Sequence, residues 1–199
     1  NNNYLSKFIA NNYAQYAKAN PDYIDAPMLS NHDQNRIITS VRGDHEKMKV
    51  AASIYLTLEG IPFIYYGEEI GMLGGKPDED IRLPFIWGDD DPMQTKWRNS
   101  KYNTAVTPVS EQENDPNSLL THYKRIIRVR NKNHALYAGK FNFLESNNPS
   151  VVAYNMKSDK QSAIILHNLA SSEESISVDV TGYTLEFCQK KDGFAQNDN

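Results

Sequence analysis

Two short apolar runs on either side of one helix constrain the fold of this chain most strongly. Residues 24–30 (IDAPMLS) and 61–67 (IPFIYYG) are rich in apolar and aromatic side chains, a composition typical of buried strands. Residues 44–60 between them have a helical pattern, with Asp44 as the expected N-cap and Gly60 just past the end. The order predicts a βαβ unit, and the second run is expected to be a strand buried on both faces of a parallel sheet.

Helical periodicity also marks two further segments. Residues 4–18 carry apolar side chains at helical spacing and predict an amphipathic helix. Residues 115–131 predict another helix, with Asp115 as its N-cap. Residues 72–115 show no sustained period, and irregular stretches of this length are often functional.

The pattern changes from helical to alternating near residue 138. Ile176, Val178 and Val180, for example, alternate with polar neighbours, as in a half-buried antiparallel strand. We therefore expect a small antiparallel β-sandwich over residues 138–190. Residues 191–199 form a polar tail.

The composition of the chain argues against several classes of binding partner and of structural site. The chain has 199 residues and a net charge of −4, which gives no support for nucleic-acid binding or for attachment to an anionic membrane. No apolar run approaches the roughly 20 residues of a membrane-spanning helix. The single cysteine, Cys188, excludes an internal disulfide framework and a cysteine-rich zinc site.

His32 and Asp33 are the first candidate site residues. They lie in LSNHDQNR, residues 29–36, where the first apolar run ends. In parallel α/β proteins, side chains at the carboxyl ends of strands face the active site. A histidine–aspartate pair is a weak signal by itself, and a hydrogen-bonded pair in a loop is the alternative.

Four segments in series resemble the α-amylase superfamily of glycoside hydrolases (family 13). They are LSNHDQNR, EGIPFIYYGEEIGM, IRLPFIWGD and DPNSLLTHYKRIIRVRN. The resemblance implies that residues 1–137 are the C-terminal portion of a partial (β/α)8 TIM barrel, and that residues 138–190 are the β domain that follows it. The expected fold class is therefore α/β plus all-β.

The resemblance also implies roles for individual residues. Asp33 matches the third catalytic carboxylate of the family, which stabilises the transition state, and His32 matches a histidine that hydrogen-bonds the same sugar ring. Arg36 and Arg82 are candidates for binding substrate in the same cleft. Exposed ion pairing is the alternative for both arginines.

Other acidic and aromatic residues near these segments have weaker functional expectations. Adjacent Glu68 and Glu69 are expected to be scaffolding at the barrel mouth. Trp87 and Trp97 either stack on sugars or pack in loops. Residues 88–91 (GDDD) are expected to be solvated loop charges, with a calcium site as the alternative. We predict no cofactor for this fragment, although the full-length enzyme could bind calcium.

The sequence lacks two of the family's three catalytic carboxylates. A retaining glycosidase uses a nucleophile and a general acid about 5 Å apart, and neither family motif occurs here. Because these motifs are missing, we expect the chain to be a fragment. The resemblance implies that the whole enzyme is secreted and extracellular and acts on α-glucans such as starch and maltooligosaccharides. The fragment alone is predicted to be inactive and to self-associate through exposed barrel edges.

Three alternatives stay open from the sequence. The first is an oligo-1,6-glucosidase or neopullulanase-like member of the same superfamily. The second is a non-catalytic carbohydrate-binding or structural module, in which the β domain is the functional part. The third is a transporter-associated, amylase-like protein without catalysis.

Overall fold

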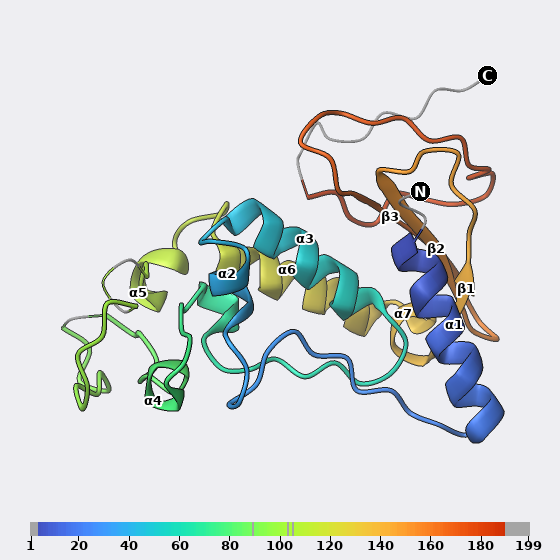
Figure 1. The fold of residues 1–199 in the computed structure, drawn as a ribbon. Helices are drawn as coiled ribbons and strands as arrows, with labels where there is room; N and C mark the ends of the chain where they lie inside the picture. Colours follow the sequence, from blue (N-terminus) through green and yellow to red (C-terminus); the bar gives the residue numbers. More distant parts are fainter. Residues whose placement is uncertain (1–3, 89, 103, 105, 190–199) are drawn as a thin grey trace.

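The computed structural model describes residues 4–88, 90–102, 104 and 106–189. Two central helices run side by side, with the sheet and the first helix at one end and irregular loops at the other (Figure 1). The elements are α1 (Tyr4–Ala19), α2 (Ile37–Ser40), α3 (His45–Thr57), the 3-10 helix η1 (Glu68–Ile70), α4 (Asp78–Ile81), α5 (Val109–Gln112), α6 (Leu119–Lys132), α7 (His134–Ala138), β1 (Lys140–Phe143), β2 (Val151–Lys157) and β3 (Ser162–Asn168). Within the described part of the chain, every helix is too short or too polar to cross a bilayer.

The helix expected between the two apolar runs is confirmed as α3. Its N-cap is Asp44, whose side chain accepts a hydrogen bond of 3.0 Å from the backbone N–H of Lys47. Helix α3 packs against α6, and the core between them includes Met48, Leu56 and Tyr123. This helix pair supports the loops that carry the candidate site.

Helix α6 begins later than the sequence predicts. Its N-cap is Ser118, whose Oγ accepts a 3.0 Å hydrogen bond from the N–H of Thr121. The prediction of Asp115 as N-cap is therefore wrong. The Asp115 carboxylate instead accepts the N–H of Asn117 two residues later, which forms an Asx turn ahead of the helix.

The two apolar runs are extended and parallel, but neither forms a regular strand. The N–H of Ile61 donates to Asp25 O at 2.8 Å, and that of Phe63 donates to Pro27 O at 2.9 Å. A complete parallel ladder also needs an N–H from position 27 to Ile61 O, and proline has none. The predicted order of an extended run, a helix and a second parallel run is therefore confirmed, but the two runs do not form the regular strands that the sequence predicts.

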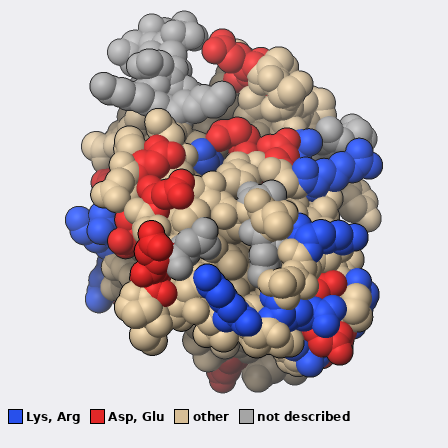
Figure 2. Space-filling view, turned by 90° about the vertical axis from the view of Figure 1, so that its left-hand side faces the viewer, with Lys and Arg blue, Asp and Glu red and all other residues tan. Residues whose placement is uncertain are grey.

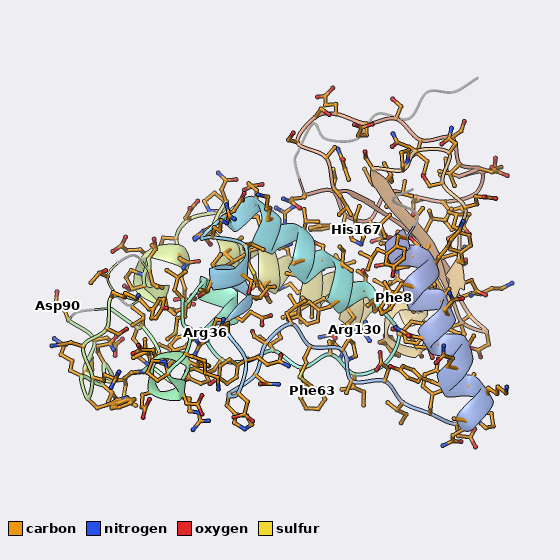
Figure 3. The ribbon with its side chains drawn as sticks, viewed as in Figure 1. Phe8, Arg36, Phe63, Asp90, Arg130 and His167 are labelled. Carbon is orange, nitrogen blue, oxygen red and sulfur yellow. The ribbon has the colours of Figure 1, made fainter. Side chains whose placement is uncertain are left out.

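The prediction that the second run is buried on both faces is also wrong. Ile61 and Phe63 are each 57% exposed, and Figure 3 shows the Phe63 ring pointing away from the body of the molecule. Ile24 and Met28 of the first run are exposed as well. The two runs therefore present one open apolar surface.

The C-terminal region contains one three-stranded antiparallel sheet in the order β1–β2–β3. Among the described residues there is no second sheet, so the predicted β-sandwich is not found. In the segment after β3, backbone groups form hydrogen bonds with side chains instead of with a neighbouring strand. Ser177 N donates to Asn147 Oδ1 at 3.2 Å, and Asn148 Nδ2 donates to Ser175 O at 3.1 Å.

A hydrophobic core joins α1 to this sheet. Ile9 and Tyr13 of α1 pack in one cluster with Val152, Tyr154 and Met156 of β2. The core therefore crosses the expected division between residues 1–137 and 138–190, which remains a prediction. The expected tail, residues 191–199, lies outside the described residues.

Arg130 of α6 satisfies backbone carbonyls at the end of α3. Its Nη1 donates to Leu56 O and to Leu58 O, both at 2.9 Å, and its Nη2 donates to Gly60 O at 2.6 Å. The side chain is buried, and Figure 3 shows it beneath the α3–α6 pair. One guanidinium thus connects α6 to the C-terminus of α3 and to Gly60, the residue just before the second apolar run.

Candidate active site

The candidate site is the loop that follows the first apolar run. Asn31 Oδ1 accepts the N–H of Asp33 at 2.9 Å and that of Gln34 at 3.1 Å. This turn presents the side chains of His32 and Asp33 to solvent, with exposures of 66% and 63%. Both predicted residues therefore lie where a ligand can reach them.

A charged cluster forms around the Asp33 carboxylate. Arg82 Nη2 lies 3.1 Å from Asp33 Oδ1 and 3.0 Å from Asp78 Oδ2, and its Nε donates to the backbone oxygen of His32 at 3.1 Å. His32 Nε2 lies 3.2 Å from Asp33 Oδ2. Lys76 contacts Asp78, and this hydrogen bond lowers the pKa of the Asp78 carboxyl. The structure thus brings together His32, Asp33 and Arg82.

The ion pairs of this cluster orient the Asp33 side chain more than they stabilise the fold. Exposed ion pairs contribute little to folding because water screens them. Arg82, however, contacts the backbone of the turn and the Asp33 carboxylate at once. It therefore restrains the direction of the carboxylate, which stays accessible and can accept hydrogen bonds from a polyhydroxylated ligand.

The structure places Arg36 away from this surface, in contrast to the sequence expectation for it. The side chain is 1% exposed, and its guanidinium donates to Ile81 O at 2.9 Å and to Tyr66 O at 2.6 Å. It also packs 4.5 Å from the ring centroid of Tyr65, and Figure 3 shows it within the loops next to α2. Arg36 thus connects loops from below the site, and neither cleft lining nor exposed ion pairing describes it.

Glu68 lies in the protein interior beneath the same loop. It is 2% exposed and accepts hydrogen bonds from Ser30 Oγ at 2.7 Å and from Tyr55 OH and Tyr123 OH, both at 2.9 Å. Burial raises the pKa of Glu68, and the three hydroxyl donors act in the opposite direction. Burial also raises the pKa of neighbouring Glu69. Sequence reasoning did not identify the three donors, because no local pattern marks them.

The two tryptophans and the acidic loop lie on the irregular side of the molecule. Trp87 and Trp97 are both exposed, and the ring of Trp87 packs 4.6 Å from that of Phe85. Asp91 Oδ1 accepts the N–H of Met93, and Asp89 lies outside the described residues. Figure 2 looks onto this side, where acidic and basic side chains are both present.

No candidate metal centre is found in the described ranges. Nowhere in them do three or more His, Cys, Asp or Glu side chains gather in a way that could hold an ion. The expectation of calcium in the full-length enzyme therefore remains a prediction, without support from these residues.

Comparison with known proteins identifies the family of the chain. Residues 4–139 match the family model described as the alpha amylase catalytic domain. The chain belongs to the α-amylase family. The matched range includes the loop with His32 and Asp33 and the arginine that contacts them.

Individual relatives agree with this α-amylase assignment. Alpha-amylase 3 of Dictyoglomus thermophilum is 43% identical over 164 residues, which cover 80% of this chain and 33% of the relative. Alpha-amylase SusG of Bacteroides thetaiotaomicron is 34% identical over 179 residues, covering 85% of this chain and 26% of the relative. The crystal structure of the α-amylase from H. orenii superposes with a TM-score of 0.69 at 49% identity, covering 74% of this chain and 30% of that one. The chain thus spans a minor share of each relative.

Proposed function

We propose that this chain is the C-terminal portion of a secreted α-amylase-type retaining glycoside hydrolase that acts on α-glucans such as starch and maltooligosaccharides. The observation that carries the proposal is the cluster of His32, Asp33 and Arg82 at the end of the first parallel run. Family membership supports it, since the residues of the cluster lie inside the matched range.

Asp33 acts on the transition state in this proposal. Cleavage of a glycosidic bond places positive charge on the sugar ring, and an ionised carboxylate beside the ring stabilises that charge. Asp33 is exposed and oriented by Arg82 for this task. His32 donates a hydrogen bond to a hydroxyl of the same ring, and the contact with Arg82 holds the Asp33 carboxylate in its direction.

The remaining chemistry belongs to polypeptide outside this sequence. The nucleophile and the general acid come from other strand ends of the barrel in the proposed enzyme. The loops at those ends also shape the rest of the cleft, so the proposal specifies α-glucans as the substrate class and leaves the linkage open.

The first prediction concerns activity. Purified residues 1–199 are expected to release no reducing sugar from soluble starch above the buffer background, because two of the three carboxylates are absent. The full-length enzyme that contains this chain serves as the positive control. Hydrolysis by the isolated chain that survives repurification and is abolished by Asp33→Ala would contradict the prediction.

The second prediction concerns self-association, which we propose for the isolated chain. The open surface is formed by the exposed side chains of Ile24, Met28, Ile61 and Phe63. Light scattering is expected to show species larger than a monomer, with the mean mass rising with protein concentration.

A matched pair of variants tests which surface is responsible. Phe63→Gln should lower the mean mass, because it removes an exposed ring from the open surface. Tyr4→Gln removes a ring that is 73% exposed on α1, outside that surface, and should leave the mass unchanged. A monomer at all concentrations, or an equal effect of the two variants, would refute the proposal.

A further inference from the structure

The carboxylate of Glu68 joins three elements beneath the candidate site. Its Oε1 accepts hydrogen bonds from Tyr55 of α3 and Tyr123 of α6, and its Oε2 accepts one from Ser30 at the end of the first apolar run. A buried carboxylate without donors would be strongly destabilising, so three hydroxyls are needed to accommodate it. Two of the three contacts lie within the helical core, and only the third reaches the site loop.

Ser30 places this third contact directly against the site. It is 2% exposed and immediately precedes Asn31, whose side chain accepts the backbone N–H of Asp33. The Ser30–Glu68 hydrogen bond of 2.7 Å therefore fixes the residue from which the turn departs.

The other end of the loop contacts the same segment of chain. Arg36, which follows the loop, donates to Tyr66 O at 2.6 Å, two residues before Glu68. Both ends of the loop that carries His32 and Asp33 are thus connected to residues 66–68. This arrangement restrains the loop from two sides without contacting the solvent-exposed carboxylate itself.

We propose that Glu68 is a positioning residue for catalysis, which holds the Asp33 loop in its active geometry through the hydrogen bond to Ser30. This inference rests on the proposed function of Asp33. Displacement of a catalytic group by about 1 Å can lower the rate by up to roughly 100-fold while the fold persists. Loss of the Ser30 contact is therefore expected to affect turnover more than folding.

Two variants, each of which removes one hydroxyl that donates to the Glu68 carboxylate, separate a positioning role from a contribution to core stability. In the full-length enzyme, Ser30→Ala should lower kcat roughly 10-fold with KM changed less than about threefold, because the loop shifts while other binding contacts remain. Tyr55→Phe removes a donor to Glu68 inside the core and should leave kcat within about twofold of wild type. Glu68→Gln should retain most of the turnover, since the serine hydroxyl can accept a hydrogen bond from the amide.

A second measurement follows the loop directly. Amide hydrogen exchange over residues 31–35 should be faster in Ser30→Ala than in wild type and unchanged in Tyr55→Phe. This readout requires no turnover, and a core defect shared by both variants would not produce the difference between them.

The outcomes distinguish this inference from the proposed function. If Asp33→Ala abolishes turnover and Ser30→Ala matches Tyr55→Phe in kcat and in exchange, the positioning role of Glu68 is overturned and the proposed function stands. If Asp33→Ala keeps wild-type turnover, both are overturned. A selective loss in Ser30→Ala, with retention in Glu68→Gln, supports the inference.

Discussion

Replacing Arg130 by methionine is expected to lower the free energy of unfolding by about 3–5 kcal/mol. Methionine matches the length of the aliphatic part of the side chain but donates no hydrogen bond. The carbonyl oxygens of Leu56, Leu58 and Gly60 would lose the donor that the buried Arg130 side chain supplies. Equilibrium urea denaturation of the full-length enzyme, followed by circular dichroism, measures the difference.

Arg128 supplies the matched control on the same helix. Its side chain is exposed, so Arg128→Met should change the free energy of unfolding by no more than about 0.5 kcal/mol. An equal loss for the two variants would show that the cost comes from the helix sequence rather than from the three hydrogen bonds that Arg130 donates.

The helices could be predicted because their signals are local. Asp44 and the spacing of apolar residues were sufficient to locate α3. The start of α6 was missed, because Asp115 and Ser118 are both good capping residues and the choice depends on the turn that Asp115 makes with Asn117.

The strands expected in the two apolar runs and in the last part of the chain are not formed, because each depends on contacts between distant residues. Composition predicted a strand buried on both faces at 61–67, but burial depends on what packs against the run, and Ile61 and Phe63 are exposed. Pro27 further prevents a complete ladder between the runs. The alternation at Ile176 and Val178 predicts a strand. In the structure, however, asparagine side chains form hydrogen bonds with backbone groups of that segment.

The site was partly visible in the sequence for similar reasons. His32 and Asp33 are adjacent and end an apolar run, so local reasoning could find them. Arg82 came from the family resemblance, and its contact with Asp33 depends on the fold. The sequence predicts cleft binding or exposed ion pairing for Arg36, because nothing local shows that carbonyl oxygens of Tyr66 and Ile81 accept hydrogen bonds from it.

The second large effect is expected at Asp33. In the full-length enzyme, Asp33→Ala should lower kcat on maltooligosaccharides about 1,000-fold, because it removes the negative charge beside the developing positive charge of the sugar ring. The carboxylate is exposed and contributes only surface ion pairs to folding, so the thermal midpoint should stay close to that of wild type.

Asp179→Ala is the control for this variant. Asp179 is an exposed aspartate that accepts the N–H of Thr181 in a turn of the C-terminal region. It has the same side chain and is likewise exposed, yet it lies outside the charged cluster. Its replacement should leave kcat within about twofold of wild type.

The most direct test of the account is therefore kcat of Asp33→Ala, measured beside Asp179→Ala on the same maltooligosaccharide and with folding verified for both. The account predicts a loss of about three orders of magnitude for the first variant and almost none for the second. Turnover by Asp33→Ala within tenfold of the control would contradict a role for this carboxylate in stabilising the transition state.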